Sequence, residues 1–302
     1  MSLLVVGSVA FDDVETRFGR RERILGGSAS YFSMAASRFA PVQMVAVVGD
    51  DFPQEILDDF ATRGCDTAGI ERATGRTFFW RGKYSPDFST RTTLETQLNV
   101  FAGFTPKLPA HFCDASFLFL ANIHPDLQLQ VLDSMKNNPF VAGDTMNLWI
   151  TTERPTLEKL VSRLQLITVN DEEARQLTGQ WHLLQAGRAI QKMGPRTVIL
   201  KKGEHGAMLF HDDELFFAPA FPLASFVDPT GAGDTFAGGF MGSLARAGVV
   251  DSSSLRRAMF YGTVAASHTV EQFSVDGLRE LTLERLDERF ATLVDFTTCP
   301  TR

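Results

Sequence analysis

Short apolar segments alternate with helical patterns along most of the chain, and this alternation is the feature that most constrains the fold. The apolar segments are Leu3–Val6, Val42–Val48, Ser116–Leu120, Leu164–Val169 and Thr197–Lys201. Strands that are buried on both faces belong to parallel sheets covered by helices. The sequence therefore predicts an α/β fold with a doubly wound, mostly parallel central sheet that is flanked by helices.

The alternation is interrupted between residues 74 and 104. Arg76–Tyr84 is rich in β-forming residues, and Arg91–Val100 predicts a further strand or two. Together with strands from about residues 12–24, these segments are expected to form a small β-sheet lid that protrudes from the main domain. Alternate aromatic side chains of this lid, such as Phe78 and Trp80, would share one face and serve lid packing or dimer contact.

Composition excludes several classes of protein. The chain has 302 residues, of which 44% are apolar, and we interpret residues 1–302 as a single α/β domain. The net charge is −7 and no basic tract occurs, which argues against nucleic acid as a partner. No apolar run approaches membrane-spanning length. The three cysteines form no CxxC pair, which favours a reduced, cytoplasmic setting.

Residues 228–240 combine glycines, acids and the start of a helix. Gly231 and Gly233 permit a tight turn, so the amides of Gly231, Ala232 and Gly233 are expected to form a row of free N–H donors at the helix N-terminus. Such a row binds anions. Asp234 stands beside it, where a carboxylate is a poor phosphate ligand and a plausible proton acceptor. The alternative is a glycine-rich turn with a capping aspartate.

The string from Asp228 to Phe240 resembles the C-terminal signature of the ribokinase-like (PfkB) carbohydrate kinases. In that family the aspartate at the position of Asp234 acts as the base, and the adjoining amides hold the transferring phosphoryl group. The resemblance also implies that Asp228 and Thr230 help to hold a monovalent cation, with K⁺ as the candidate. It extends over nearly the whole chain.

The resemblance implies a sugar site near the N-terminus. By spacing, Asp12 matches an aspartate that binds sugar hydroxyls, although Ala10 stands where the family often has Asn. Gly26 and Gly27 match glycines that line the sugar site, for which a plain helix cap is the alternative. Asn99, at the base of the lid, faces the site only by analogy.

Three polar residues follow the predicted strands of the middle segment. Asn122, after Ser116–Leu120, is a candidate substrate ligand. Asp144 and Asn147 follow the next strand and could face substrate or metal. Ligands of doubly wound sheets lie beyond the carboxyl ends of the strands, although Asn and Asp also serve as turn residues and caps.

Asn170 and Glu173 are three residues apart at a predicted helix start, so they share one face. The purely structural alternative is that Asn170 is an N-cap and that the acids after it lie in the first turn of the helix. They also match the family's Asn-x-x-Glu motif, in which the asparagine orients phosphates and the glutamate holds Mg²⁺ through water. Oxygen ligands and retained waters suit Mg²⁺.

The loop Lys202–Gly206 resembles the family's nucleotide loop, with Gly203 and Gly206 at the matching positions. The family often has Thr two residues before the first glycine, where this chain has Lys201. Either Lys201 or Lys202 could reach a phosphate, or both could be solvated.

These features predict an ATP- and Mg²⁺-dependent kinase that phosphorylates a hydroxyl of a sugar, with Asp234 as base. A nucleoside kinase of the same family is the alternative, and a non-catalytic sugar- or nucleotide-binding regulator is a second one. The expected partners are the small-molecule substrate and ATP. A homodimer formed through the lid is an open alternative to a monomer.

Overall fold

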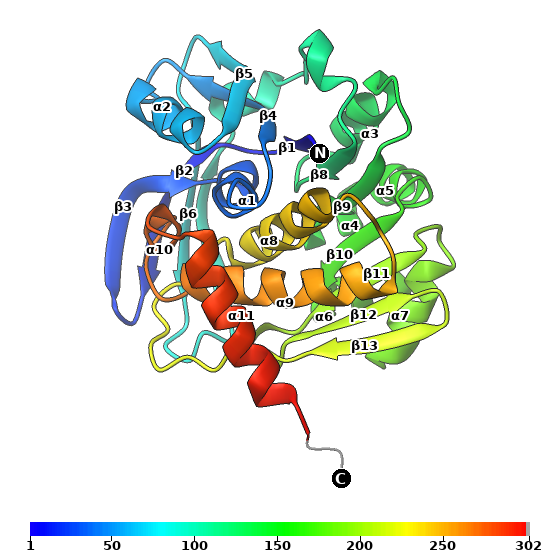
Figure 1. The fold of residues 1–302 in the computed structure, drawn as a ribbon. Coiled ribbons are helices and arrows are strands. Elements are labelled where there is room, and N and C mark those ends of the chain that lie inside the picture. Colours follow the sequence, from blue (N-terminus) through cyan, green and yellow to red (C-terminus); the bar gives the residue numbers. More distant parts are fainter. Residues whose placement is uncertain (300–302) are drawn as a thin grey trace.

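The computed structural model describes residues 1–299 and has the predicted fold. Nine strands form the central sheet (Figure 1). In spatial order they are β13 (Glu214–Ala218), β12 (Ala207–His211), β11 (Thr197–Lys201), β10 (Leu166–Asn170), β9 (Phe140–Asp144), β8 (Phe117–Leu120), β1 (Leu3–Val6), β4 (Val42–Gly49) and β5 (Cys65–Ala73). The seven strands from β11 to β5 pair in parallel, whereas β12 and β13 are antiparallel.

The strand β1 shows why the central sheet is covered on both faces. Leu3 and Val5 belong to one hydrophobic core, and Leu4 and Val6 belong to the other, so successive side chains enter opposite layers. All four side chains are fully buried. This explains the continuous apolar run, because a strand with one solvated face would alternate with polar residues.

Helices form the two outer layers. The first core lies beneath α1 (Ser28–Ala36), α2 (Gln54–Thr62), α8 (Ala232–Ala247), α9 (Ser252–Thr269), α10 (Asp276–Arg279) and α11 (Leu283–Thr297). In Figure 1, α8 and α9 cross this face next to one another and α11 runs over α9. The second core lies beneath α3 (Pro125–Ser134), α4 (Asn147–Thr152), α5 (Arg154–Val161), α6 (Asp171–Thr178) and α7 (Leu183–Gln191).

The lid is a separate four-stranded sheet. Its spatial order is β3 (Gly19–Gly26), β2 (Ala10–Thr16), β6 (Phe78–Tyr84) and β7 (Arg91–Gln97). It is mixed, because β2 pairs in parallel with β6 while the outer pairs are antiparallel. Three short 3₁₀ helices complete the structure, namely η1 (Asn99–Gly103), η2 (Ala110–Phe112) and η3 (Gly203–His205).

The sheet edges were not predicted in full. The edge strands β5 and β13 carry exposed, polar positions, so their pattern does not resemble that of the buried central strands. Both pair with a neighbour whose apolar pattern is clear, although the pairing of β5 with β4 shifts register between Gln43 and Val45. Tertiary pairing therefore decides their conformation, which local sequence leaves open.

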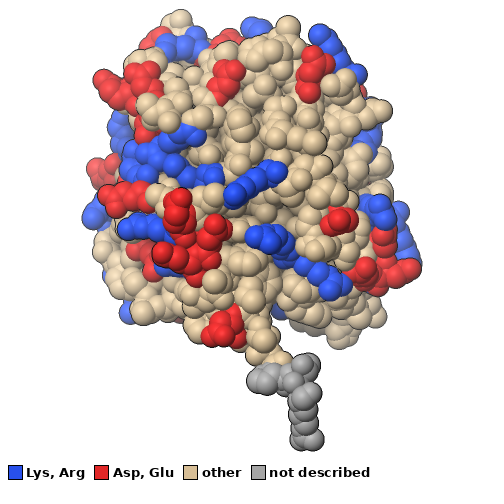
Figure 2. Space-filling model, in the orientation of Figure 1, with Lys and Arg blue, Asp and Glu red and all other residues tan. Residues whose placement is uncertain are grey.

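The surface carries both acidic and basic side chains, as the composition indicates. On the face that Figure 2 shows, basic and acidic side chains lie intermixed. Within residues 1–299, no helix combines the length and apolarity that crossing a membrane requires.

Candidate active site

The strand order reverses next to β1, and we call the carboxyl-end edge of the sheet around this reversal the crevice. From β1 the chain builds β4 and β5 on one side, then returns to build β8 to β13 on the other. Ligands of open α/β sheets bind beyond the carboxyl ends of the strands at such a reversal. Asn122, Asp144, Asn170 and Lys201 lie at or just after the carboxyl ends of β8, β9, β10 and β11.

The N-terminus of α8 is fixed by close packing. Gly231 adopts a left-handed conformation, with φ of 74°, as the N-cap of α8. A Cβ at Gly231 would lie 2.4 Å from the ring of Tyr31, so only glycine fits between the turn and α1. Farther along α8, a Cβ at Gly238 would lie 2.3 Å from the Phe32 carbonyl oxygen. Glycine therefore holds α8 close against α1.

The turn presents two free amides instead of the three that were expected. The Ala232 amide donates to the Pro229 carbonyl at 3.2 Å, so the expectation of a free donor is wrong for Ala232 in this structure. The cause is the tight turn itself, which folds this amide back onto the preceding carbonyl. Among the described residues, neither the Gly231 nor the Gly233 amide has a hydrogen-bond acceptor.

The Asp234 carboxylate lies at this helix start and has no side-chain hydrogen-bond partner within residues 1–299. Burial raises the pKa of Asp234 to about 7, and repulsion by Asp144 acts in the same direction. The positive charges of Lys201 and Arg91 oppose this rise. A pKa near neutrality suits a group that must accept a proton at physiological pH.

Asp12 lies within β2 and not in a turn. The residue is 5% exposed, and its carboxylate has no hydrogen-bond partner among the described residues. Burial raises the pKa of Asp12 to about 8, with further increases from Asp228, Asp234 and Asp13. A Cβ at Gly26 would lie 2.0 Å from an Asp12 carboxylate oxygen, so Gly26 makes room for this side chain. Gly27, with φ of 94°, is the N-cap of α1.

Two tyrosines that the sequence analysis did not assign to the site lie beside these carboxylates. The Tyr31 hydroxyl is buried and has no hydrogen-bond partner among residues 1–299, and burial followed by the charge of Asp12 raises its pKa. The Tyr84 hydroxyl lies 3.1 Å from the Thr230 hydroxyl, which joins the lid to the start of α8. The signal for Tyr31 in the sequence is a bulky polar side chain directly after the small residues that follow Gly27.

Asn99 and Asn122 already use their side chains within the protein. The Asn99 amide nitrogen donates to the Thr77 carbonyl at 2.9 Å, and this supports the base of the lid. The Asn122 carbonyl oxygen accepts from Trp149 at 2.9 Å. Substrate binding by either residue stays a prediction.

Asn170 and Glu173 form the capping box of α6. The Asn170 side chain accepts from the Glu173 amide at 2.8 Å, and the Glu173 carboxylate accepts from the Asn170 amide at 2.8 Å. The structural interpretation of this motif is therefore realised, and the functional one is compatible with it. Burial, followed by Asp144, raises the pKa of Glu173 to about 7, although Lys201 opposes the rise.

Lys201 and Asp144 form an ion pair inside the crevice. Their Nζ and Oδ2 atoms are 3.2 Å apart, and the side chains are 18% and 8% exposed. Burial lowers the pKa of Lys201, but Asp144, Glu173 and Asp234 together outweigh it and raise the pKa above its ordinary value. Asn147 instead donates to Gln176 at 2.9 Å.

The glycine loop closes on itself. The Lys202 amide donates to the Gly206 carbonyl at 2.8 Å, and the Gly206 amide donates to the Gly203 carbonyl at 3.1 Å. Gly203 and Gly206 both have positive φ, and a Cβ at Gly206 would lie 2.1 Å from the Ala218 carbonyl oxygen. The conformation of the loop therefore requires glycine at these two positions, independently of any ligand.

Asp228 anchors the turn before α8. Its side chain is fully buried, one oxygen accepts from the Thr230 amide at 2.9 Å, and burial raises its pKa. No group of three or more His, Cys, Asp or Glu side chains that could hold a metal occurs in residues 1–299.

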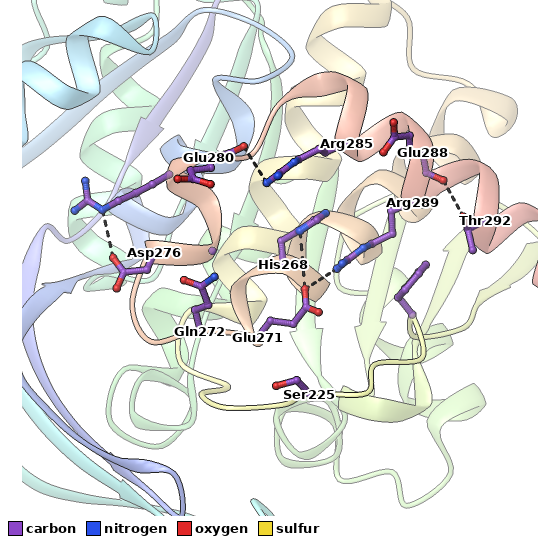
Figure 3. Close-up of a pocket in the computed structure, with 13 residues that line it drawn as sticks. Ser225, His268, Glu271, Gln272, Asp276, Glu280, Arg285, Glu288, Arg289 and Thr292 are labelled. Atoms are coloured by element: carbon purple, nitrogen blue, oxygen red, sulfur yellow. Dashed lines mark hydrogen bonds and ion pairs between the residues drawn. The ribbon is translucent and has the colours of Figure 1, made fainter.

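A separate cavity of about 920 Å³ lies near the end of α9, beneath α10 and α11 (Figure 3). None of the predicted site residues lines it. Its charged groups largely pair with one another, as Arg289 does with Glu271 and Arg279 does with Asp276. Chemistry therefore places the candidate active site in the crevice at the strand ends, and not in this cavity.

Comparison with known proteins agrees with this geometry. Residues 2–280 match the family described as pfkB family carbohydrate kinase. The cytidine kinase of Thermococcus kodakarensis is 30% identical over 251 residues, which cover 82% of this chain and 89% of that protein. The ribokinase of Haemophilus influenzae is 25% identical over 312 residues, covering 95% and 98% of the two chains.

Solved structures share the fold. The aminoimidazole riboside kinase of Salmonella enterica, complexed with aminoimidazole riboside and an ATP analogue, gives a TM-score of 0.78 at 20% identity, covering 96% of this chain and 100% of that one. The Burkholderia thailandensis nucleoside kinase in complex with inosine gives 0.77 at 20% identity, covering 96% and 97%. The predicted fold class is confirmed.

Proposed function

The chain belongs to the pfkB family of carbohydrate kinases, and from this premise we propose that it transfers the γ-phosphoryl group of ATP to a hydroxyl of a sugar. The observation that carries the proposal is the Asp234 carboxylate, which lies at the start of α8 beside the Gly231 and Gly233 amides and has no side-chain hydrogen-bond partner within residues 1–299. Phosphoryl transfer needs positioning and charge stabilisation more than covalent chemistry by the protein. This arrangement supplies both.

The acceptor hydroxyl is held and deprotonated by carboxylates. In the proposal, Asp12 accepts hydrogen bonds from acceptor hydroxyls, because its buried oxygens have no partner within the described residues. Asp234 takes the proton of the reacting hydroxyl as the oxygen attacks phosphorus. The Gly231 and Gly233 amides stabilise negative charge on the transferring group. Asn99, Asn122, Gly26 and Gly27 complete the proposed acceptor site.

The nucleotide lies on the other side of the crevice in this proposal. Asn170, Lys202, Gly203 and Gly206 are its proposed contacts, at the ends of β10 and β11. Glu173 would hold Mg²⁺ through water, because only one of its oxygens is used by the capping box. Bound Mg²⁺ would neutralise negative charge on the phosphates. Asp228 and Thr230 are the proposed residues for a monovalent cation such as K⁺.

A nucleoside is the second candidate acceptor. The observation that favours it is the cytidine kinase relative, which matches over most of both chains at 30% identity. A ribose with adjacent hydroxyls presents the same groups to Asp12 whether it is free or joined to a base. A sugar and a nucleoside thus fit one mechanism and differ in the contacts around the base.

Two further proposals concern the setting of the enzyme. We place it in the cytoplasm, since the sequence has an odd number of cysteines and no CxxC pair, which favours a reduced setting. We also propose that the lid can pair two subunits. Leu94 and Leu98, on and after β7, are 54% and 48% exposed, and large apolar side chains of this kind favour burial against a second lid.

An acceptor panel tests the proposed function. Purified protein with MgATP is mixed separately with ribose, fructose, myo-inositol, cytidine, adenosine and inosine, and ADP formation and phosphorylated product are measured. We expect at least one acceptor to give stoichiometric ADP and product. Acceptor binding in a thermal-shift screen with no ADP formation would instead support the non-catalytic regulator.

A further inference from the structure

We propose that Lys201 is a catalytic residue whose ammonium group contacts the transferring γ-phosphoryl group, and that Asp144 is the residue that positions it. This inference rests on the proposed function and deepens it. It assigns one of the two lysines that the sequence left open, Lys201, to the phosphoryl-binding turn, beside the backbone amides.

The position of Lys201 supports this role. Lys201 ends β11, where it pairs with Asn170 at the end of β10. Its Nζ lies 3.1 Å from the point that a Cβ on Gly233 would occupy. Because Gly233 carries no side chain, the ammonium approaches the helix start directly. It therefore lies beside an amide that has no acceptor within residues 1–299.

The turn has one free hydrogen-bond donor fewer than expected, and the Lys201 ammonium can supply a donor in its place. Ala232 donates to Pro229, so the expected trio of amides is reduced to Gly231 and Gly233. A charge-assisted hydrogen bond from an ammonium is roughly twice as strong as a neutral one. One lysine at this point therefore supplies stabilisation that a further amide would otherwise give.

Asp144 fixes the direction of the lysine side chain. The ion pair is 3.2 Å long and largely buried, with side-chain exposures of 18% and 8%. A buried pair of this kind adds little net stability compared with apolar residues of the same size, because both charges lose their water. A further partner for the ammonium would explain why this ion pair lies in the crevice. A phosphoryl group is such a partner, because it is an anion and would lie between the cation and the free amides.

The adjacent lysine does not share these features. Within residues 1–299, Lys202 has no side-chain hydrogen bond or ion pair, and its backbone serves the glycine loop. Of the two lysines that the sequence left open, Lys201 is thus the one that faces the helix start.

The test compares K201M with Lys159→Met, which removes an exposed lysine from α5 on a different part of the surface. We expect K201M to lower kcat by about 10²-fold, as loss of a transition-state donor typically does. Affinity for ATP should fall by about tenfold and affinity for AMP should not change, because AMP lacks the terminal phosphoryl groups. D144N should lower kcat less, and K159M should match the wild type.

Folding is checked by thermal melting. If K201M unfolds because Asp144 is left unpaired, the double variant K201M/D144N removes both charges and is measured instead. A kcat within threefold of wild type, or equal losses of ATP and AMP affinity, would overturn the inference. If the wild type turns over no acceptor, the proposed function fails separately, and the contrast between ATP and AMP binding still decides whether Lys201 meets a phosphoryl group.

Discussion

The two sides of the crevice differ in how their buried and half-buried polar groups are satisfied. On the phosphate side, which comprises Asn170, Glu173, Lys201 and Asp144, each side chain has a partner inside the protein. On the acceptor side, which comprises Asp12, Tyr31 and Asp234, no side-chain hydrogen bond joins these groups to the rest of residues 1–299. An unsatisfied buried polar group costs about 1–3 kcal/mol.

The difference indicates which side has its geometry fixed by the protein before a ligand binds. The phosphate side keeps its geometry through a capping box and an ion pair, so in the proposed function a nucleotide would bind without rearranging these bonds. The acceptor side carries destabilising groups that a ligand with several hydroxyls would satisfy. Such a site discriminates strongly, because an analogue that lacks a hydroxyl leaves a buried carboxylate unpaired. The predictions below follow from this contrast.

The largest effect is expected at the reacting end of the acceptor side. Asp234→Asn keeps the size of the side chain but cannot accept the hydroxyl proton, so kcat should fall by about 10³-fold. Acceptor and ATP affinity, measured by calorimetry, should stay near the wild-type values. Loss of both affinities would show that Asp234 supports the structure of the turn and is not chiefly the base.

A smaller effect is expected on the phosphate side. Glu173→Gln can still accept from the Asn170 amide, so the cap remains while the charge is removed. We expect the KM for MgATP to rise about tenfold and the thermal stability to change little. The matched control is Glu172→Gln, which alters an exposed acid in the same turn. Equal KM values for the two variants would contradict the proposed role of Glu173 toward Mg²⁺.

The smallest effect is a change in stability that separates two adjacent aspartates. Asp12 and Asp13 are both 5% exposed, but Asp13 accepts from Arg81 at 3.1 Å and from the Arg23 amide at 2.8 Å. At pH 8, Asp12→Asn should therefore stabilise the ligand-free protein by about 1–3 kcal/mol, and Asp13→Asn should destabilise it. Denaturant unfolding measures both. Destabilisation by both variants would remove the contrast between the two sides.

The size of the stability effect of Asp12 depends on pH. The pKa of Asp12 is raised to about 8, so the unfolded chain loses this proton near its ordinary value of 3.8 while the folded protein retains it. Stability is thus highest below about pH 4 for this group and declines as pH rises toward 8. The gain from Asp12→Asn should be larger at pH 8 than at pH 5.

The features that the sequence predicted well depend on interactions between residues that are close in the sequence. The buried strands, the start of α8 and the Asn170–Glu173 pair are set by residues within a few positions of one another. The pairing of Lys201 with Asp144 spans 57 residues, and the contact of Tyr84 with Thr230 spans 146. No local pattern encodes such contacts. The acceptor side could be predicted only by resemblance, because it forms where the lid, α1 and α8 meet.

The central claim is that a carboxylate at position 234 removes the acceptor proton, and the pH dependence of a single turnover tests it most directly. With ATP and acceptor saturating, the wild-type transfer rate should fall about tenfold per pH unit below about pH 7, the pKa of Asp234. The Asp234→Asn variant should be slow and lack this acid limb. A wild-type rate that stays flat from about pH 5.5 to 8, or an unchanged limb in the variant, would contradict the account.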